Sequence, residues 1–151
     1  MEESGGNVFP AKESLGGRKC NEKGCLCNKE GFCGLMGTGL DYVCLTPSEC
    51  NKEAFIKGNI KDQIFAGASI LRRIIDKKIC TLDNKNLLED INNPQYIMHL
   101  FGCYGKGSGM YPKLLKEIAL KTNKDISQIT PADIATTKTS LEQQPVAANA
   151  I

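Results

Sequence analysis

The chain has 151 residues, with 19 basic and 17 acidic side chains and a formal net charge of +2. A domain of this length can bury a sizeable core. The near-neutral charge, without a basic stripe or arm, excludes a protein that binds nucleic acid mainly by electrostatics, so we expect no nucleic-acid partner. No apolar run approaches the roughly 20 residues that span a bilayer. The polar, acidic residues 1–6 do not resemble a signal peptide.

Eight cysteines are the unusual feature of the composition. Zinc sites use Cys or His pairs about two to four residues apart, whereas this sequence has no Cys-x-x-Cys and a single histidine, His99. We therefore favour disulfides over zinc or free thiols, and expect neither a metal nor a cofactor. Disulfides indicate an extracellular, periplasmic or cell-envelope location, and the chain would then be a mature or truncated piece. The expected disulfide cysteines are Cys20, Cys25, Cys27, Cys33, Cys44, Cys50, Cys80 and Cys103.

The positions of the cysteines predict part of their pairing. Cys80 follows the longest helical pattern, and Cys103 lies on the helix expected to pack beside it. Both are remote from the cluster that extends from Cys20 to Cys50. We therefore predict that Cys80 pairs with Cys103 and that the other six cysteines pair among themselves.

The first third of the chain has almost no helical periodicity. Residues 8–45 are rich in glycine and cysteine, which is typical of an insertion ordered by covalent links. Directly afterwards, Thr46-Pro47-Ser48-Glu49 has the pattern of a capping box with proline at the first helical position. We expect a helix to begin there and to run towards Lys57.

The rest of the chain is dominated by helical patterns, with no alternating pattern long enough for a useful strand. Helices are expected at about 60–78, from Asn93-Pro94 onward and at about 111–121, with a short turn at 130–133 and a tail from 136. The fold class predicted is therefore all-α. The expected apolar stripes are Ile60, Ile64, Gly67, Ala68, Leu71, Ile74 and Ile75 on the first helix, Ile97, Met98, Phe101 and Tyr104 on the second, and Leu114, Leu115, Ile118 and Ala119 on the third. His99 lies one residue off its stripe, so we expect it at the surface or at the rim of the apolar face, and not as a ligand.

Four short segments could contribute to a functional site, although each is weak when taken alone. Glu-Ser near the start is a common pair, and a glycine-rich break after a helix is usually only a cap. Their order along the chain makes the signal stronger. The segments are Glu3-Ser4-Gly5-Gly6-Asn7, Gly34-Leu35-Met36, the helical stretch from Gln63 to Leu71, and the stretch from Cys103 to Gly109.

In this order the segments resemble the lysozyme-like domain of lytic transglycosylases and goose-type lysozymes. That family has Glu-Ser with small residues and Asn, then Gly-Leu-Met-Gln, then Asn-Ile-x-x-Gly-x-x-x-Leu, and finally Ala-Tyr-Asn-Ala-Gly-x-Gly. The resemblance extends over about residues 1–120. The chain departs from the pattern at three places, with Gly37 in place of Gln, Gln63 in place of Asn and Gly105 in place of Asn.

The resemblance implies a catalytic role for Glu3. A carboxyl that protonates a glycosidic oxygen must stay protonated near neutral pH, and burial against apolar groups raises its pKa. In lytic transglycosylases, as the resemblance implies, one Glu acts as acid and then as base while the substrate's N-acetyl group assists. Glu13 in Glu13-Ser14 is the alternative acid. The substrate-binding residues that the resemblance implies are Ser4, Gly34, Leu35, Met36, Gln63 and Tyr104.

We expect the Glu3 carboxyl to lie in a groove lined by Met36 and Tyr104. The helix that carries Tyr104 should break at Gly105-Lys106-Gly107, because glycine allows positive φ, and the break should direct the Tyr104 hydroxyl towards Glu3.

The sequence leaves two functions open. The first is a lytic transglycosylase or lysozyme that cleaves the MurNAc–GlcNAc bond of peptidoglycan. The second is a secreted module that binds cell wall on a lysozyme-like scaffold and has lost catalysis. In either case we expect a monomer without a membrane span, with a lysozyme-like domain over 1–124 and a short helical turn and disordered tail over 125–151.

Overall fold

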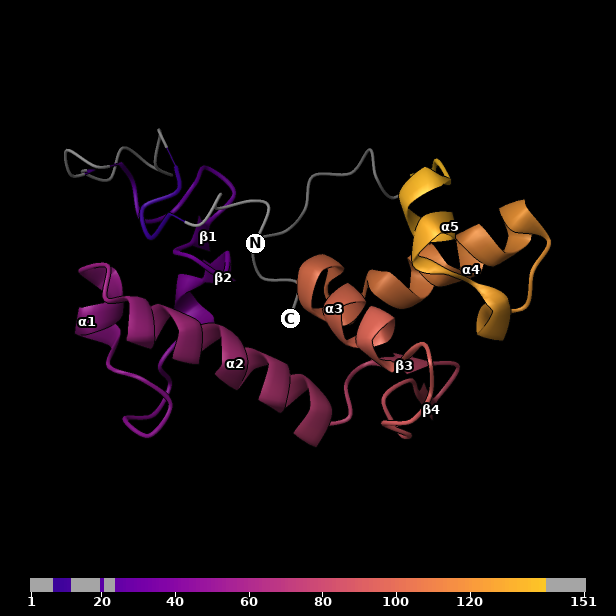
Figure 1. Ribbon diagram of the computed structural model, residues 1–151, viewed down its shortest axis with the longest axis horizontal. Coiled ribbons are helices and arrows are strands. Elements are labelled where there is room, and N and C mark those ends of the chain that lie inside the picture. The colour runs from indigo at the N-terminus through magenta and orange to yellow at the C-terminus, as the bar shows by residue number, and fades with distance from the viewer. Residues whose placement is uncertain (1–6, 12–19, 21–23, 141–151) are drawn as a thin grey trace. The chain divides into compact units, whose positions relative to one another are not determined.

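The computed structural model describes residues 7–11, 20 and 24–140 (Figure 1). These residues are rich in helix, with two small two-stranded sheets and four disulfides. The all-α prediction is therefore confirmed for the helical character but misses the two short hairpins. The chain forms two compact units, residues 1–72 and 73–151.

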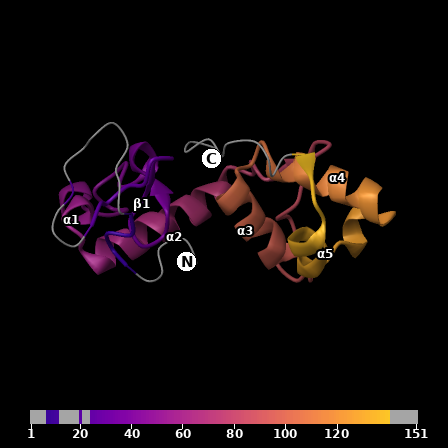
Figure 2. The ribbon, with the colours of Figure 1, turned by 90° about the horizontal axis from the view of Figure 1, so that it is seen from above.

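The first unit combines a disulfide-linked hairpin with two helices. Strands β1 (Phe32–Cys33) and β2 (Thr38–Gly39) pair antiparallel and are followed by the 3-10 helix η2 (Leu40–Tyr42). Helix α1 (Lys52–Ile56) then leads into α2 (Ile60–Asp76), whose last turn belongs to the second unit. Both views place the hairpin beside the first half of α2 (Figures 1 and 2). The buried side chains of this unit include Val43, Phe55, Ala66 and Ile70.

Helix α1 begins later than the sequence predicts, so the expected capping box is wrong. The residues Thr46-Pro47-Ser48-Glu49 form a separate turn, in which the Glu49 N–H donates to the Thr46 carbonyl. The helix is instead capped by Asn51, whose side chain accepts a hydrogen bond from the Ala54 N–H at 3.0 Å. Asparagine and threonine are both good caps, and the competing Asn51 lies directly after the Cys44–Cys50 disulfide.

The buried face of α2 differs from the expected apolar stripe. Gly67 and Ile74 are buried as predicted, but Ile60 and Ile64 are 59% and 44% exposed. Gln63 is completely buried in their place, since its amide is used in hydrogen bonds inside the first unit. A stripe chosen by hydrophobicity alone could not include this residue. The buried positions of α2 are Gln63, Ala66, Gly67, Ile70 and Ile74.

The second unit contains a short hairpin and three helices. Strands β3 (Thr81–Leu82) and β4 (Lys85–Asn86) pair antiparallel. Helix α4 (Tyr111–Thr122) packs against α3 (Tyr96–Lys106), the 3-10 helix η3 (Ile126–Gln128) and α5 (Pro131–Thr136). Figure 2 shows α5 lying close to this helical group. On α4, Leu114, Leu115 and Ile118 are buried as the sequence predicts.

The buried face of α3 also differs from the prediction. Ile97 and Phe101 are 60% and 52% exposed, whereas His99, expected at the surface or rim, is only 1% exposed. His99 is buried because Tyr111 provides a hydrogen-bond partner from α4. The helix ends at Lys106, and Gly107 follows it with φ of +90°. This agrees with the break predicted at Gly105-Lys106-Gly107.

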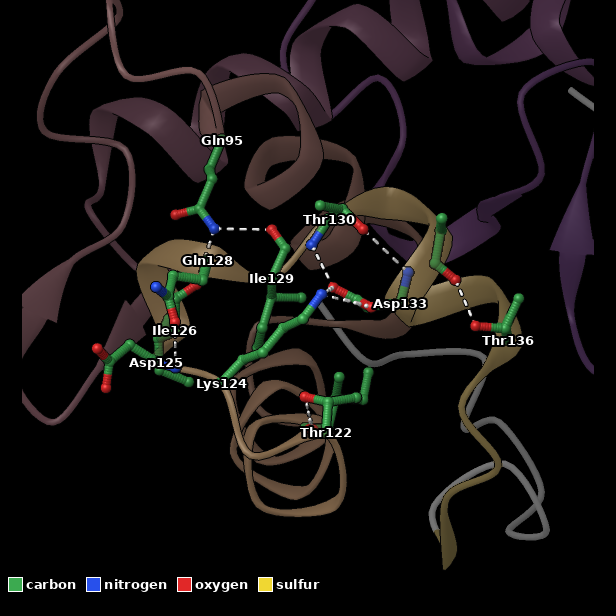
Figure 3. Close-up of polar contacts among 12 residues, drawn as sticks. Gln95, Thr122, Lys124, Asp125, Ile126, Gln128, Ile129, Thr130, Asp133 and Thr136 are labelled. Atoms are coloured by element: carbon green, nitrogen blue, oxygen red, sulfur yellow. Dashed lines mark hydrogen bonds and ion pairs between the residues drawn. The ribbon is translucent and has the colours of Figure 1, made fainter.

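The segment after α4 is held by paired side chains rather than by a large core (Figure 3). Asp125 and Gln128 form one capping box, and Thr130 and Asp133 form a second. Lys124 Nζ lies 2.8 Å from Asp133 Oδ2, and this ammonium lowers the pKa of Asp133. The short turn predicted at 130–133 is therefore the beginning of α5.

The part of the expected tail that the structure describes is attached to α4. Ser140 donates its backbone N–H to Glu117 Oε1 at 2.8 Å, and Lys121 donates to the Lys138 carbonyl at 2.6 Å. Thr139 is 4% exposed. Residues 137–140 thus differ from the tail that the sequence predicts, because α4 offers both a carboxylate and an ammonium to their polar groups. The remaining expected tail, residues 141–151, lies outside the described residues.

All eight cysteines form disulfides, as expected. Cys80 pairs with Cys103 within the second unit, which confirms the predicted long-range link. The other pairs are Cys20–Cys25, Cys27–Cys33 and Cys44–Cys50, each between neighbours in sequence. Over the described ranges, no helix is long and apolar enough to cross a bilayer.

Candidate functional site

The Gly34–Gly37 turn joins β1 to β2 and carries three of the candidate residues. Gly34 and Gly37 have φ of +69° and +60°, a conformation that side chains with a Cβ rarely adopt. The Gly37 N–H donates to the Gly34 carbonyl at 3.2 Å, and the Gly34 N–H donates to the Leu26 carbonyl at 2.8 Å. Within this turn Leu35 is 8% exposed, while Met36 is half-buried. The glycines therefore let the chain reverse tightly while it buries Leu35.

Gln63 holds this turn against the start of α2. Its Oε1 accepts the Leu35 N–H at 2.7 Å, and its Nε2 donates to the carbonyls of Phe55 and Val8 at 3.2 and 3.1 Å. One amide thus connects the turn, α1 and the segment 7–11. A Cβ on Gly34 would lie 2.8 Å from Gln63 Cδ, so this close approach also needs glycine. The geometry gives Gln63 a positioning role for the turn, and its substrate-binding role remains a prediction.

The helix glycine of the third motif meets the methionine of the second. A Cβ on Gly67 would lie 2.7 Å from Met36 Cγ and 2.8 Å from Met36 Cβ. Met36 therefore lies across the small surface that Gly67 leaves on α2. The structure brings the second and third sequence motifs into direct contact, although they are separated by about 30 residues of chain.

Tyr104 lies in the second unit and is half-buried on α3. It precedes the helix end at Lys106 and the positive φ of Gly107, so the turn of the fourth motif has the backbone break expected of it. The proximity of the Tyr104 hydroxyl to the Glu3 carboxyl remains a prediction, because Glu3 lies outside the described residues.

The remaining site candidates lie outside the described residues. They are the proposed acid Glu3, its neighbour Ser4, and the alternative acid Glu13. The predicted groove that Met36 and Tyr104 would form around Glu3 therefore remains a prediction.

The sequence did not reveal a buried polar pair in the second unit. His99 Nδ1 lies 2.8 Å from the Tyr111 hydroxyl, and the two rings meet edge to face. Burial lowers the pKa of His99 and raises that of Tyr111, so both groups are held in their neutral forms. The only signal available in the sequence was that His99 is the sole histidine and lies within an apolar helix.

No family model, curated protein sequence or solved structure matches the chain. The resemblance to the lysozyme-like domain therefore depends on the motif residues alone.

Proposed function

We propose that the chain is a peptidoglycan-cleaving enzyme, a lytic transglycosylase or lysozyme that acts on the MurNAc–GlcNAc bond. Glu3 serves as the single acid and base, with Ser4 beside it. The turn residues Gly34, Leu35 and Met36 line the substrate path, and Tyr104 has the substrate-binding role that the resemblance implies. Gln63 holds the turn in position for the glycan.

The observation that supports this proposal most directly is the contact between the second and third motifs. Gly-Leu-Met and the helix glycine are separate features of the sequence, yet Met36 lies against Gly67 and Leu35 is bonded to Gln63. Chance similarity in two short motifs gives no reason for them to pack together. A shared scaffold gives such a reason.

The disulfides fit the location that this function needs. Four disulfide bonds persist in an oxidising compartment, where peptidoglycan is also found. We propose an extracellular or periplasmic enzyme.

The test is digestion of purified peptidoglycan, with products identified by mass spectrometry. Release of 1,6-anhydromuropeptides identifies a transglycosylase, and release of reducing ends identifies a lysozyme. Glu3→Gln should lower the rate by about 10²–10⁴-fold, the usual contribution of a general acid. Glu2→Gln is the matched control, because it removes the neighbouring carboxyl and should leave the rate unchanged.

Two other results would contradict the proposed mechanism or function. Full activity in Glu3→Gln together with loss in Glu13→Gln would transfer the acid role to Glu13. Sedimentation of the wild-type protein with peptidoglycan, without any cleavage, would instead support a binding module that has lost catalysis. The departures at Gly37, Gln63 and Gly105 from the family pattern are the features that would explain such a loss.

A further inference from the structure

The second unit contains a pocket that uses none of the residues of the proposed cleavage site. Its volume is about 500 Å³, within the range of about 300–1,000 Å³ typical of sites for small ligands. It lies between the β3–β4 hairpin, the start of α3 and η3. The residues that line it are Leu82, Asp83, Lys85, Asn86, Leu87, Glu89, Asp90, Asn93, Gln95, His99, Ile126 and Ser127.

His99 lines the pocket as a buried side chain with one ring nitrogen available. Nδ1 is engaged by the Tyr111 hydroxyl, while Nε2 has no hydrogen-bond partner within the described part of the chain. The tautomer of the neutral ring decides whether Nε2 donates or accepts a hydrogen bond. In either form His99 presents to the pocket a ring nitrogen that no described residue engages.

Several amides around the pocket are fixed in orientation by the backbone. Gln95 Nε2 donates to the carbonyls of Ile126 and Ile129 at 2.7 and 2.9 Å (Figure 3), and within the described part of the chain its Oε1 has no donor. Asn93 Oδ1 accepts the Gln95 N–H, and Asn86 Oδ1 accepts the Leu88 N–H. Among the described residues, the Nδ2 groups of both asparagines therefore have no acceptor. These side chains are arranged before any ligand arrives, which lowers the cost of binding.

The charged groups determine which ligands the pocket can accept. Three carboxylates and one lysine line it, so the lining has an excess of negative charge that disfavours phosphates and other anions. One Asp83 oxygen is bonded to Lys116, and one Asp90 oxygen accepts the Asn92 N–H. Within the described residues, the Glu89 carboxylate has no bonded partner, so it can accept hydrogen bonds at both oxygens.

We propose that this pocket binds a saccharide. Hydroxyl groups are both donors and acceptors, and they match a lining that offers free carboxylate and amide oxygens together with free N–H groups. Leu82, Leu87 and Ile126 provide apolar surface for the C–H faces of a sugar ring. The proposal does not depend on the cleavage mechanism, because binding at this pocket requires neither Glu3 nor the Gly34–Gly37 turn.

The single histidine makes binding measurable by NMR in the full chain, because only one pair of imidazole ring protons is present. Chitotetraose and maltotetraose are the saccharide probes, and they distinguish an amino-sugar ligand from a glucose-based one. Cadaverine and inorganic phosphate test an amine and an anion. We expect saturable shifts of the His99 ring signals with at least one saccharide and no shifts with phosphate.

Two variants test the assigned contacts. Asn93→Asp keeps the oxygen that accepts the Gln95 N–H and replaces only the free donor, so it should preserve the loop. Glu89→Gln removes the unpaired carboxylate. Each should weaken saccharide binding by roughly tenfold or more, from the loss of a hydrogen bond that involves a free polar group. The matched control, Glu30→Gln, changes an exposed glutamate of the first unit and should bind as the wild type does.

The proposal is overturned if neither saccharide shifts the His99 signals, or if cadaverine alone does. It is also overturned if both pocket variants bind the saccharide as tightly as Glu30→Gln. Because the readout is binding at His99, these results can be separated from a failure of peptidoglycan cleavage.

Discussion

At the scale of single residues, two buried polar side chains organise the two units. Gln63 links three segments of the first unit through one amide. His99 joins α3 to α4 in the second unit through the Tyr111 hydroxyl. A buried polar group that loses its hydrogen-bond partner destabilises the folded state. Substitution of Gln63 or His99 should therefore lower the free energy of unfolding by a measurable amount.

Replacing Gln63 should destabilise the first unit. Gln63→Leu keeps a similar volume but removes the side-chain acceptor of the Leu35 N–H, whereas the Phe55 carbonyl still accepts the Gly58 N–H. We expect a loss of about 1–3 kcal/mol from the buried Leu35 N–H that is left unpaired. Urea denaturation followed by circular dichroism measures the loss. Ile64→Ala, at the exposed neighbouring position on α2, is the control and should change the stability by much less. Equal effects of the two variants would contradict the linking role of Gln63.

His99 should remain neutral below the pH at which an ordinary histidine takes up a proton. Burial lowers its pKa, so the unfolded chain binds a proton near pH 6.5 while the folded chain does not. The contribution of His99 to the free energy of unfolding is therefore fully present above about pH 6.5. It is lost as the pH falls from there towards the pKa of His99 in the folded protein. An NMR titration of the His99 ring protons gives the midpoint directly. A midpoint at or above 6.5 would contradict the buried, neutral state.

The same two residues explain which parts of the fold were predictable. The turn glycines, the helix at 111–121 and the Cys80–Cys103 bond follow from local chemistry and position, and the structure has them. The buried faces of α2 and α3 differ from the predicted stripes because Gln63 and His99 are polar, and polar residues are expected at the surface. Each is buried by a partner more than ten residues away, and no local pattern indicates that partner. For the candidate cleavage site, the sequence predicts only the four motifs and their order along the chain. It does not predict the contacts that join them, such as that between Met36 and Gly67.

At the scale of secondary-structure elements, glycines determine how closely neighbouring elements approach. Gly67 admits Met36 against α2, and Gly102 of α3 lies directly under the Tyr111 ring of α4. Glycine has a low helix propensity and so weakens both helices at these points, but its lack of a side chain allows the neighbouring residue to pack closely. Gly105, three residues further along α3, has open space at the position of a Cβ: apart from its chain neighbours and the adjoining backbone of α3, no atom of the described residues lies within 4 Å.

This difference predicts opposite effects for two identical substitutions on α3. Gly102→Ala forces a methyl group into the Tyr111 ring and should cost about 1–3 kcal/mol, as overpacking usually does. It should also disturb the Tyr111–His99 hydrogen bond, visible as a shift of the His99 ring signals. Gly105→Ala should be neutral or should stabilise the protein by up to about 1 kcal/mol through helix propensity. Thermal unfolding of the two variants provides the comparison. A destabilising Gly105→Ala together with a neutral Gly102→Ala would contradict the packing described.

At the scale of the whole molecule, the two units are stabilised in different ways. The first contains three disulfides that each close a short stretch of chain, whereas the second contains one disulfide between residues 23 apart and a larger set of buried helical side chains. A disulfide stabilises mainly by restricting the unfolded chain, and longer loops give larger effects. Removal of a short-loop disulfide should therefore destabilise the first unit, and removal of Cys80–Cys103 should destabilise the second unit by a larger amount.

Removing the Cys80–Cys103 bond should destabilise the second unit selectively. The loop-entropy relation gives about 3 kcal/mol for this bond and about 2 kcal/mol for Cys44–Cys50, whose cysteines are 6 apart. Hydrogen exchange can follow each unit separately through the Leu35 N–H, bonded to Gln63, and the Leu114 N–H of α4. Cys80→Ala/Cys103→Ala should accelerate exchange at Leu114 more than at Leu35. Cys44→Ala/Cys50→Ala, the matched control, should show the reverse order. Equal acceleration at both amides in each variant would instead show that residues 1–72 and 73–151 unfold as one cooperative unit, with α2 transmitting the loss from one to the other.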